Sequence, residues 1–96
     1  MKVTGEWQSR TVHVDGRVLS PLPSQRVWNH SPDGFNWGYG GSGPAQLALA
    51  LLLRAGLASR TAVHLHQAFK WAFVAPLPQG DFAIDIDIET WLREQR

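Results

Sequence analysis

The chain has 96 residues, which is enough for one domain spanning 1–96 and too short for a second. It has no cysteine, which excludes a disulfide framework and thiolate metal sites. The net charge is +1 and the basic residues are scattered, so we expect no nucleic-acid partner, because binding to phosphates depends on concentrated positive charge.

Charged residues make up only 18% of the chain, against about 25% in ordinary globular domains. A surface with few charges leaves room for an apolar patch, which favours a protein partner or a second copy of the chain. The N-terminus lacks the apolar core of a signal peptide. The longest apolar run, 47–53, is far shorter than the roughly 20 residues that cross a bilayer. We therefore expect a cytoplasmic protein that does not enter the membrane.

The first twenty residues favour β structure. Residues 11–14 and 17–19 alternate in polarity and flank Asp15-Gly16, a strong signal for a tight hairpin turn. An earlier strand at 3–7 could pair beside this hairpin. The serines and prolines at 20–24 then predict the end of regular structure.

Residues 27–43 predict a long ordered loop. They combine aromatic side chains with glycines and short polar residues and show neither a helical nor a strand period. A loop of this length in a compact domain is packed by its own side chains or serves a function. We expect four aromatic residues to attach it to the core: Trp28, Phe35, Trp37 and Tyr39.

Residues 44–54 predict the clearest helix. Ser42 or Gly43 can serve as its N-cap, Pro44 suits its first turn, and Gly56 is a natural stop. The body of the helix is apolar on every face, so protein must surround it. Its single polar residue, Gln46, is expected to bond the backbone of the preceding loop.

Two further helices and one strand follow. A helix at 60–71 carries an apolar stripe, a strand at 82–86 alternates in polarity, and a last helix at 87–94 has acidic residues in its first turn. The stripe of the first of these helices comprises Ala62, Leu65, Phe69 and Phe73.

The glycines before the central helix resemble phosphate-binding patterns only in part. Residues 38–43 fit G-x-G-x-x-G, but no buried strand precedes them and no acidic residue follows at about 20 positions. No lysine follows as in a P-loop, and the G-x-S-x-G elbow is incomplete. Two interpretations stay open: the amides of Gly40, Gly41 and Ser42 hold an anion or a partner's carboxylate, or the glycines allow close packing against the helix. The second is favoured.

No residue is predicted to be catalytic. His30, Asp33, Tyr39 and Ser42 could supply a nucleophile and a base if the loop folds back. Residues 31–34, however, predict a β-turn, and His30 just before it is then an ordinary loop histidine.

His64 and His66 stand two apart on a helix and point to different sides, which disfavours a shared metal. We read both as surface or half-buried histidines and expect no metal and no cofactor.

The stretch 29–52, with W-G-Y-G-G-S-G-P-A-Q-L-A-L at 37–49, and Phe69-Lys70-Trp71 resemble the domain of unknown function 6166. The 14–17 hairpin and the acidic last helix fit the same pattern, so the resemblance covers most of the chain. This family of small bacterial and phage proteins has no established activity or catalytic residues. Its occurrence in phages and mobile elements implies a host-directed binding role, such as counter-defence.

We therefore predict a small α+β domain in which an N-terminal hairpin or meander packs with a buried central helix and two further helices. The predicted function is that of a non-enzymatic protein-binding module that uses exposed loop aromatics. The alternatives are a small anion or nucleotide binder, or minor enzyme, at the glycine-rich turn, and a nucleic-acid binder with aromatic stacking platforms. The candidate binding residues are His30, Trp37, Tyr39, Gly40, Gly41 and Ser42.

Overall fold

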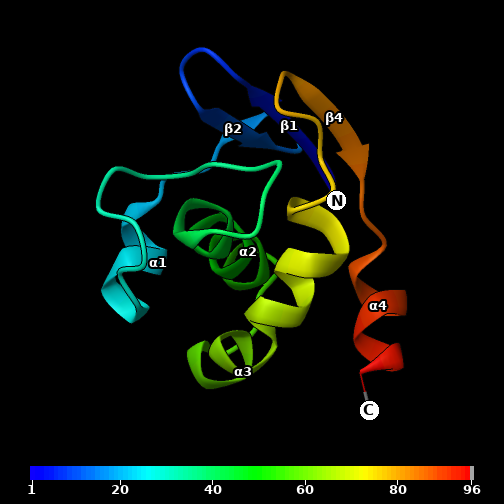
Figure 1. Cartoon of the computed structure of the whole chain (residues 1–96). Helices are drawn as coiled ribbons and strands as arrows, with labels where there is room; N and C mark the ends of the chain where they lie inside the picture. Colours follow the sequence, from blue (N-terminus) through cyan, green and yellow to red (C-terminus); the bar gives the residue numbers. More distant parts are fainter. Residues whose placement is uncertain (96) are drawn as a thin grey trace.

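A four-stranded antiparallel sheet covers one side of the central apolar helix in the computed structural model, which describes residues 1–95 (Figure 1). The strands are β1 (Lys2–Glu6), β2 (Thr11–Val14), β3 (Arg17–Val18) and β4 (Phe82–Asp85), in the spatial order β3-β2-β1-β4. Asp15 and Gly16 both have positive φ, at 50° and 81°, as a tight hairpin turn requires. The predicted hairpin is confirmed. The last strand of the chain, β4, pairs with β1 and forms the other edge of the sheet.

Alternation along the strands separates a buried face of the sheet from an exposed one. Val3, Val12 and Val14 are buried beneath the sheet, whereas their neighbours along each strand point to solvent. Gly5 lies opposite Phe82 in the β1–β4 register. A Cβ at Gly5 would overlap the Phe82 ring, so a side chain here would displace part of the core.

Helix α2 (Ser42–Arg54) lies at the centre of the molecule, as predicted (Figure 1). Every residue from 43 to 52 is buried. The sheet lies on one side of α2, and α1 (Leu22–Val27), α3 (Ser59–Phe69) and the π-helical turn η1 (Lys70–Val74) enclose the others. Gly41 is the N-cap, so the helix begins slightly earlier than the sequence pattern indicated. No helix within residues 1–95 is long and apolar enough to span a membrane.

Two elements depart from the sequence prediction. Helix α1 occupies part of a segment that was predicted to be loop, because prolines suit the first turn of a helix and Ser20 Oγ accepts a hydrogen bond from the Leu22 N–H at 3.2 Å. Helix α3 ends at Phe69, and the helical path continues beyond the predicted end at Trp71 as η1, in which the Ala75 N–H donates to the Lys70 carbonyl at 2.9 Å. The π turn keeps Val74 buried at the end of the helix.

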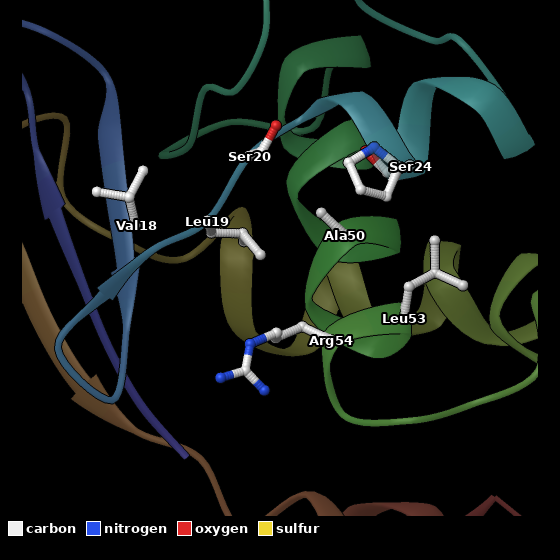
Figure 2. A pocket seen from close by; sticks show the side chains of 8 residues that line it. Val18, Leu19, Ser20, Ser24, Ala50, Leu53 and Arg54 are labelled. Atoms are coloured by element: carbon white, nitrogen blue, oxygen red, sulfur yellow. The ribbon is translucent and has the colours of Figure 1, made fainter.

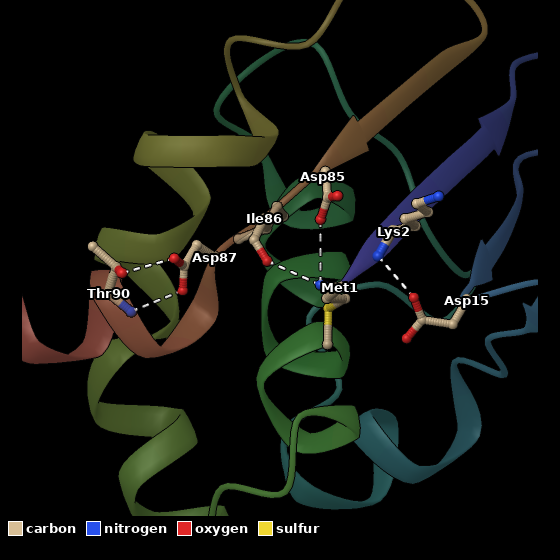
Figure 3. A network of polar contacts seen from close by, with 7 residues as sticks. All are labelled: Met1, Lys2, Asp15, Asp85, Ile86, Asp87 and Thr90. Atoms are coloured by element: carbon tan, nitrogen blue, oxygen red, sulfur yellow. Dashed lines mark hydrogen bonds and ion pairs between the residues drawn. The ribbon is translucent and has the colours of Figure 1, made fainter.

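The C-terminal helix α4 (Ile88–Glu94) packs against α3 and η1 through Trp91, whose ring stands edge-on to Phe69 at 5.1 Å. Asp87 caps α4 by accepting hydrogen bonds from the N–H and the hydroxyl of Thr90, at 3.1 Å and 2.8 Å (Figure 3). The Met1 amino group donates to the Ile86 carbonyl at 3.1 Å, which ties the segment before α4 to the start of β1.

Candidate functional site

The loop between α1 and α2 is held in place by the one polar side chain of the central helix. Gln46 is fully buried, and its Oε1 accepts hydrogen bonds from the N–H groups of His30 and Ser31 at 2.8 Å and 3.0 Å. Its Nε2 donates to Ser24 Oγ at 2.9 Å and to the Trp28 carbonyl at 3.1 Å. The predicted structural role of Gln46 is confirmed, and the amide satisfies backbone groups that the loop would otherwise leave unpaired.

A pair of histidines joins this loop to α3. His30 Nε2 lies 2.9 Å from His66 Nε2, and His66 Nδ1 lies 2.6 Å from the Val63 carbonyl oxygen. A carbonyl only accepts, so the hydrogen of neutral His66 resides on Nδ1 and its Nε2 carries a lone pair. Neutral His30 therefore donates its Nε2–H to His66 and leaves its own Nδ1 as an acceptor. If both histidines were protonated at once, neither Nε2 could accept, and this hydrogen bond would be lost.

Lys70 lies one helical turn beyond His66, on the same side of the helix, and is 6% exposed. Its Nζ donates to the Gly40 carbonyl at 3.2 Å and sits 4.4 Å from the centre of the Trp71 ring. No carboxylate forms an ion pair with Lys70 within residues 1–95, although buried lysines are usually paired. His66 and Lys70 thus attach the loop at two successive points, and Lys70 brings an uncompensated positive charge.

The electrostatics of this cluster disfavour a second positive charge. Partial burial, the neighbouring His66 and the Lys70 ammonium, in that order, lower the pKa of His30 below its ordinary value. His30 is therefore neutral at neutral pH and available as a hydrogen-bonding group.

The glycine-rich turn is covered by aromatic side chains. A Cβ at Gly40 would overlap the Trp71 indole, and a Cβ at Gly41 would overlap the Tyr39 ring. These glycines therefore permit close packing of rings over the turn. The packing favours the structural interpretation of the turn over an open anion-binding nest.

Three half-exposed aromatic residues belong to this loop or pack on it. Trp28, Tyr39 and Trp71 are 49%, 43% and 60% exposed. The Trp28 ring stacks on His30 at 4.4 Å, while Trp71 covers Gly40 next to Tyr39. Lys70 links the two pairs, because its charge acts on His30 and its Nζ lies 4.4 Å from the centre of the Trp71 ring. We call Trp28, His30, Tyr39 and Trp71 the aromatic band.

Trp37 lies in the core, whereas its predicted role in binding a partner requires an exposed side chain. Its side chain is fully buried, and its Nε1 donates to the Gly80 carbonyl at 2.9 Å. It anchors the loop as the sequence indicated, together with Phe35, but a partner cannot reach it. Trp28 and Tyr39, expected as core anchors, lie largely at the surface instead.

The structure brings some of the predicted site residues together and separates others. His30, Tyr39, Gly40 and Gly41 lie in or beneath the aromatic band. Ser42 is exposed at the start of α2, and no hydrogen bond in the described part of the chain links it or Tyr39 to His30. His30 Nε2 forms its hydrogen bond with His66, so it does not act as a base for Ser42 or Tyr39, and the nucleophile–base arrangement considered from the sequence does not form.

Sequence reasoning missed the contribution of α3 and η1 to this site. His66 was read as a surface or half-buried residue, but it is 1% exposed, whereas His64 is exposed. The available signal was the spacing of His66 and Lys70, which places two polar residues beside the apolar stripe. No group of three potential metal-ligating side chains occurs among residues 1–95.

A separate cavity lies between β3, α1 and α2 (Figure 2). It has a volume of about 300 Å³ and is mostly apolar, with one arginine. Its lining includes Val18, Leu19, Pro23, Ala50, Leu53 and Arg54.

The fold and the surface features together define a small α+β domain built around an enclosed helix, with an aromatic and histidine-containing surface over the start of that helix. The chain belongs to DUF6166, a family of unknown function, whose model matches residues 4–94. Comparison with curated proteins and with solved structures gave no match.

Proposed function

We propose that this protein is a non-enzymatic protein-binding module and that the aromatic band is its contact surface. The observation that supports the proposal is the clustering of Trp28, Tyr39 and Trp71. Among residues 1–95 they are three of the five large hydrophobic side chains that stay exposed, and they lie near the start of α2. Tryptophan and tyrosine are enriched among the residues that dominate protein interfaces, because they bury a large area at little cost in side-chain entropy.

The support beneath the band suits a binding surface. Trp28 stacks on His30, which is fixed by His66 and by Gln46, and Trp71 rests on Gly40. Rings held in this way lose less freedom on binding than mobile ones. A preorganised surface therefore needs fewer new contacts to reach a given affinity.

The chemistry between the rings favours a partner with a carboxylate near its contact centre. Lys70 Nζ lies 4.4 Å from the Trp71 ring, and its charge acts on His30, on which Trp28 stacks. Lys70 has no acidic partner among the described residues. An acidic side chain of the partner would compensate this charge. The same observation supports the alternative function, in which a free small anion binds here, and the burial of Lys70 limits access equally in both cases.

The non-enzymatic part of the proposal is supported by how the polar groups are used. His30 and His66 bond each other, and Tyr39 Oη accepts a hydrogen bond from Asn36 Nδ2 at 3.3 Å. Catalysis by an activated nucleophile needs a base within reach of that nucleophile. A cytoplasmic location and a host-directed role in phages and mobile elements stay predictions.

The test is affinity capture from a bacterial host lysate with the wild type and with Trp71→Ala and Tyr39→Ala. The matched control is Leu22→Ala, which removes an exposed apolar side chain at a different place. We expect a partner that the wild type and the control retain and both band variants lose. Loss of one interface tryptophan commonly costs about 2 kcal/mol or more, which is roughly a 30-fold change in Kd.

Circular dichroism must show that each variant is folded, and sedimentation of the purified wild type shows whether the partner is a second copy. Identical partners for all four proteins would contradict the proposal.

A further inference from the structure

The sheet stops short of covering the second half of α2. Strand β3 is an edge strand of two residues, and beyond it α2 contributes Ala50, Leu53 and Arg54 to the cavity of about 300 Å³ (Figure 2). The other walls are formed by helix α1 and by the residues that follow β3. The cavity thus borders the edge strand of the sheet and has a mostly apolar lining.

The free edge of β3 offers one residue for backbone pairing. The Leu19 N–H donates to the Val12 carbonyl at 2.8 Å, so Leu19 faces β2. Backbone groups alternate in direction along an antiparallel strand, so the N–H and C=O of the preceding Val18 point away from β2. Val18 is 68% exposed, and no further strand in the described part of the chain pairs with this edge.

The charge of the cavity is concentrated at one residue. Arg54 is exposed at the end of α2, and its guanidinium points into the gap between α2 and β3 (Figure 2). No acidic residue pairs with it within residues 1–95. A small apolar cavity with one unpaired guanidinium complements a ligand that has one apolar group and one carboxylate.

We propose that this cavity binds the C-terminal residue of a partner protein. The apolar side chain of that residue enters the cavity, its carboxylate pairs with Arg54, and its backbone pairs with the edge of Val18. A chain end fits better than an internal strand, because β3 is short and the chain turns into α1 directly after it. The site is separate from the aromatic band, and its test does not require the band to bind anything.

The first experiment is an NMR titration of the ¹⁵N-labelled wild type with N-acetyl-L-leucine, which supplies one apolar side chain and one carboxylate. We expect saturable shifts of the amides of Val18, Leu19, Ala50 and Leu53. N-acetyl-L-leucinamide, which lacks the charge, should bind at least about tenfold more weakly. Arg54→Gln should weaken binding of the acid by a similar factor, whereas Arg60→Gln, which removes an exposed arginine elsewhere, should not.

The second experiment tests backbone pairing with the peptide N-acetyl-Thr-Val-Thr-Leu, which has a free carboxylate. The wild type should bind it more tightly than N-acetyl-leucine. Val18→Pro should lose this gain, because its missing N–H cannot pair with the peptide, while proline is tolerated on edge strands where the N–H faces solvent. Arg54 lies at the surface, so the Arg54→Gln result decides the proposal even if Val18→Pro does not fold.

Several results would overturn the assignment. Equal affinity for the acid and the amide, or unchanged binding by Arg54→Gln, would remove the role of the guanidinium. Tighter binding of octanoate than of the tetrapeptide would identify a free aliphatic acid as the ligand. A dimer in sedimentation that Arg54→Gln dissociates would identify a second copy of the chain as the occupant.

Discussion

Replacing Gln46 with leucine removes the amide that joins α2 to the loop before it. The substitution roughly preserves the volume and increases the apolar character of a fully buried position. It deletes four hydrogen bonds, of which three involve loop backbone groups at residues 28–31 and one involves Ser24. The stability of the domain should therefore fall although the new side chain is more hydrophobic.

The size of the loss follows from those contacts. Each hydrogen bond contributes about 0.5–1.5 kcal/mol net, and buried groups left without a partner cost more. Part of the loop backbone can regain water, and leucine gains some transfer free energy. We therefore expect the free energy of unfolding to fall by about 2–4 kcal/mol, a large share of the 5–15 kcal/mol typical of small domains.

Urea unfolding followed by circular dichroism measures this change, and hydrogen exchange shows where it acts. The amides of His30 and Ser31 should lose protection first, because Gln46 is their acceptor. The matched control is Gln67→Leu, whose exposed amide makes one long contact of 3.3 Å and should matter by less than about 0.5 kcal/mol. A loss below 1 kcal/mol for Gln46→Leu would refute the reasoning.

Three further predictions follow from the packing and the charges. The pKa of His30 is lower in the folded state, so the unfolded state takes up a proton first as the pH drops, and the free energy of unfolding should fall between about pH 7.5 and 5. Urea titrations at several pH values should show a flatter decline for His30→Gln. An unchanged slope would contradict the assignment. Gly40→Ala should displace the Trp71 ring and cost about 1–3 kcal/mol, visible as altered tryptophan fluorescence, and an unaltered spectrum would argue against the contact. Leu49→Ala should cost about 2–5 kcal/mol in thermal unfolding, and a near-neutral result would mean that α2 is not enclosed.

Much of the fold could be predicted because its main signals are local. The Asp15-Gly16 turn specifies the hairpin, and an apolar helix with a proline in its first turn specifies the enclosed α2. The partner of the C-terminal strand could not be inferred, since the pairing of β4 with β1 depends on contacts about 80 residues apart. The π-helical turn also has no signature in the local sequence, because it differs from an α-helix only in pairing each N–H with the carbonyl five residues back instead of four.

The site was predicted only in part, for a physical reason. The loop residues His30 and Tyr39 stood out by composition, but composition does not say which aromatic side chains point inward. The indole N–H of the buried Trp37 donates to the Gly80 carbonyl, whereas Trp28 stacks on His30 at the surface. The residues from α3 and η1 reach the site only through tertiary packing.

Fluorine NMR of the protein labelled with 5-fluorotryptophan tests most directly whether the loop has the arrangement on which the proposed function depends. A soluble paramagnetic agent should broaden the resonances of Trp28 and Trp71, assigned by substitution to phenylalanine, and leave that of Trp37 sharp. Broadening of Trp37 to the same extent as Trp71 would show that the loop is not packed into the core. The aromatic band would then not exist as a fixed surface.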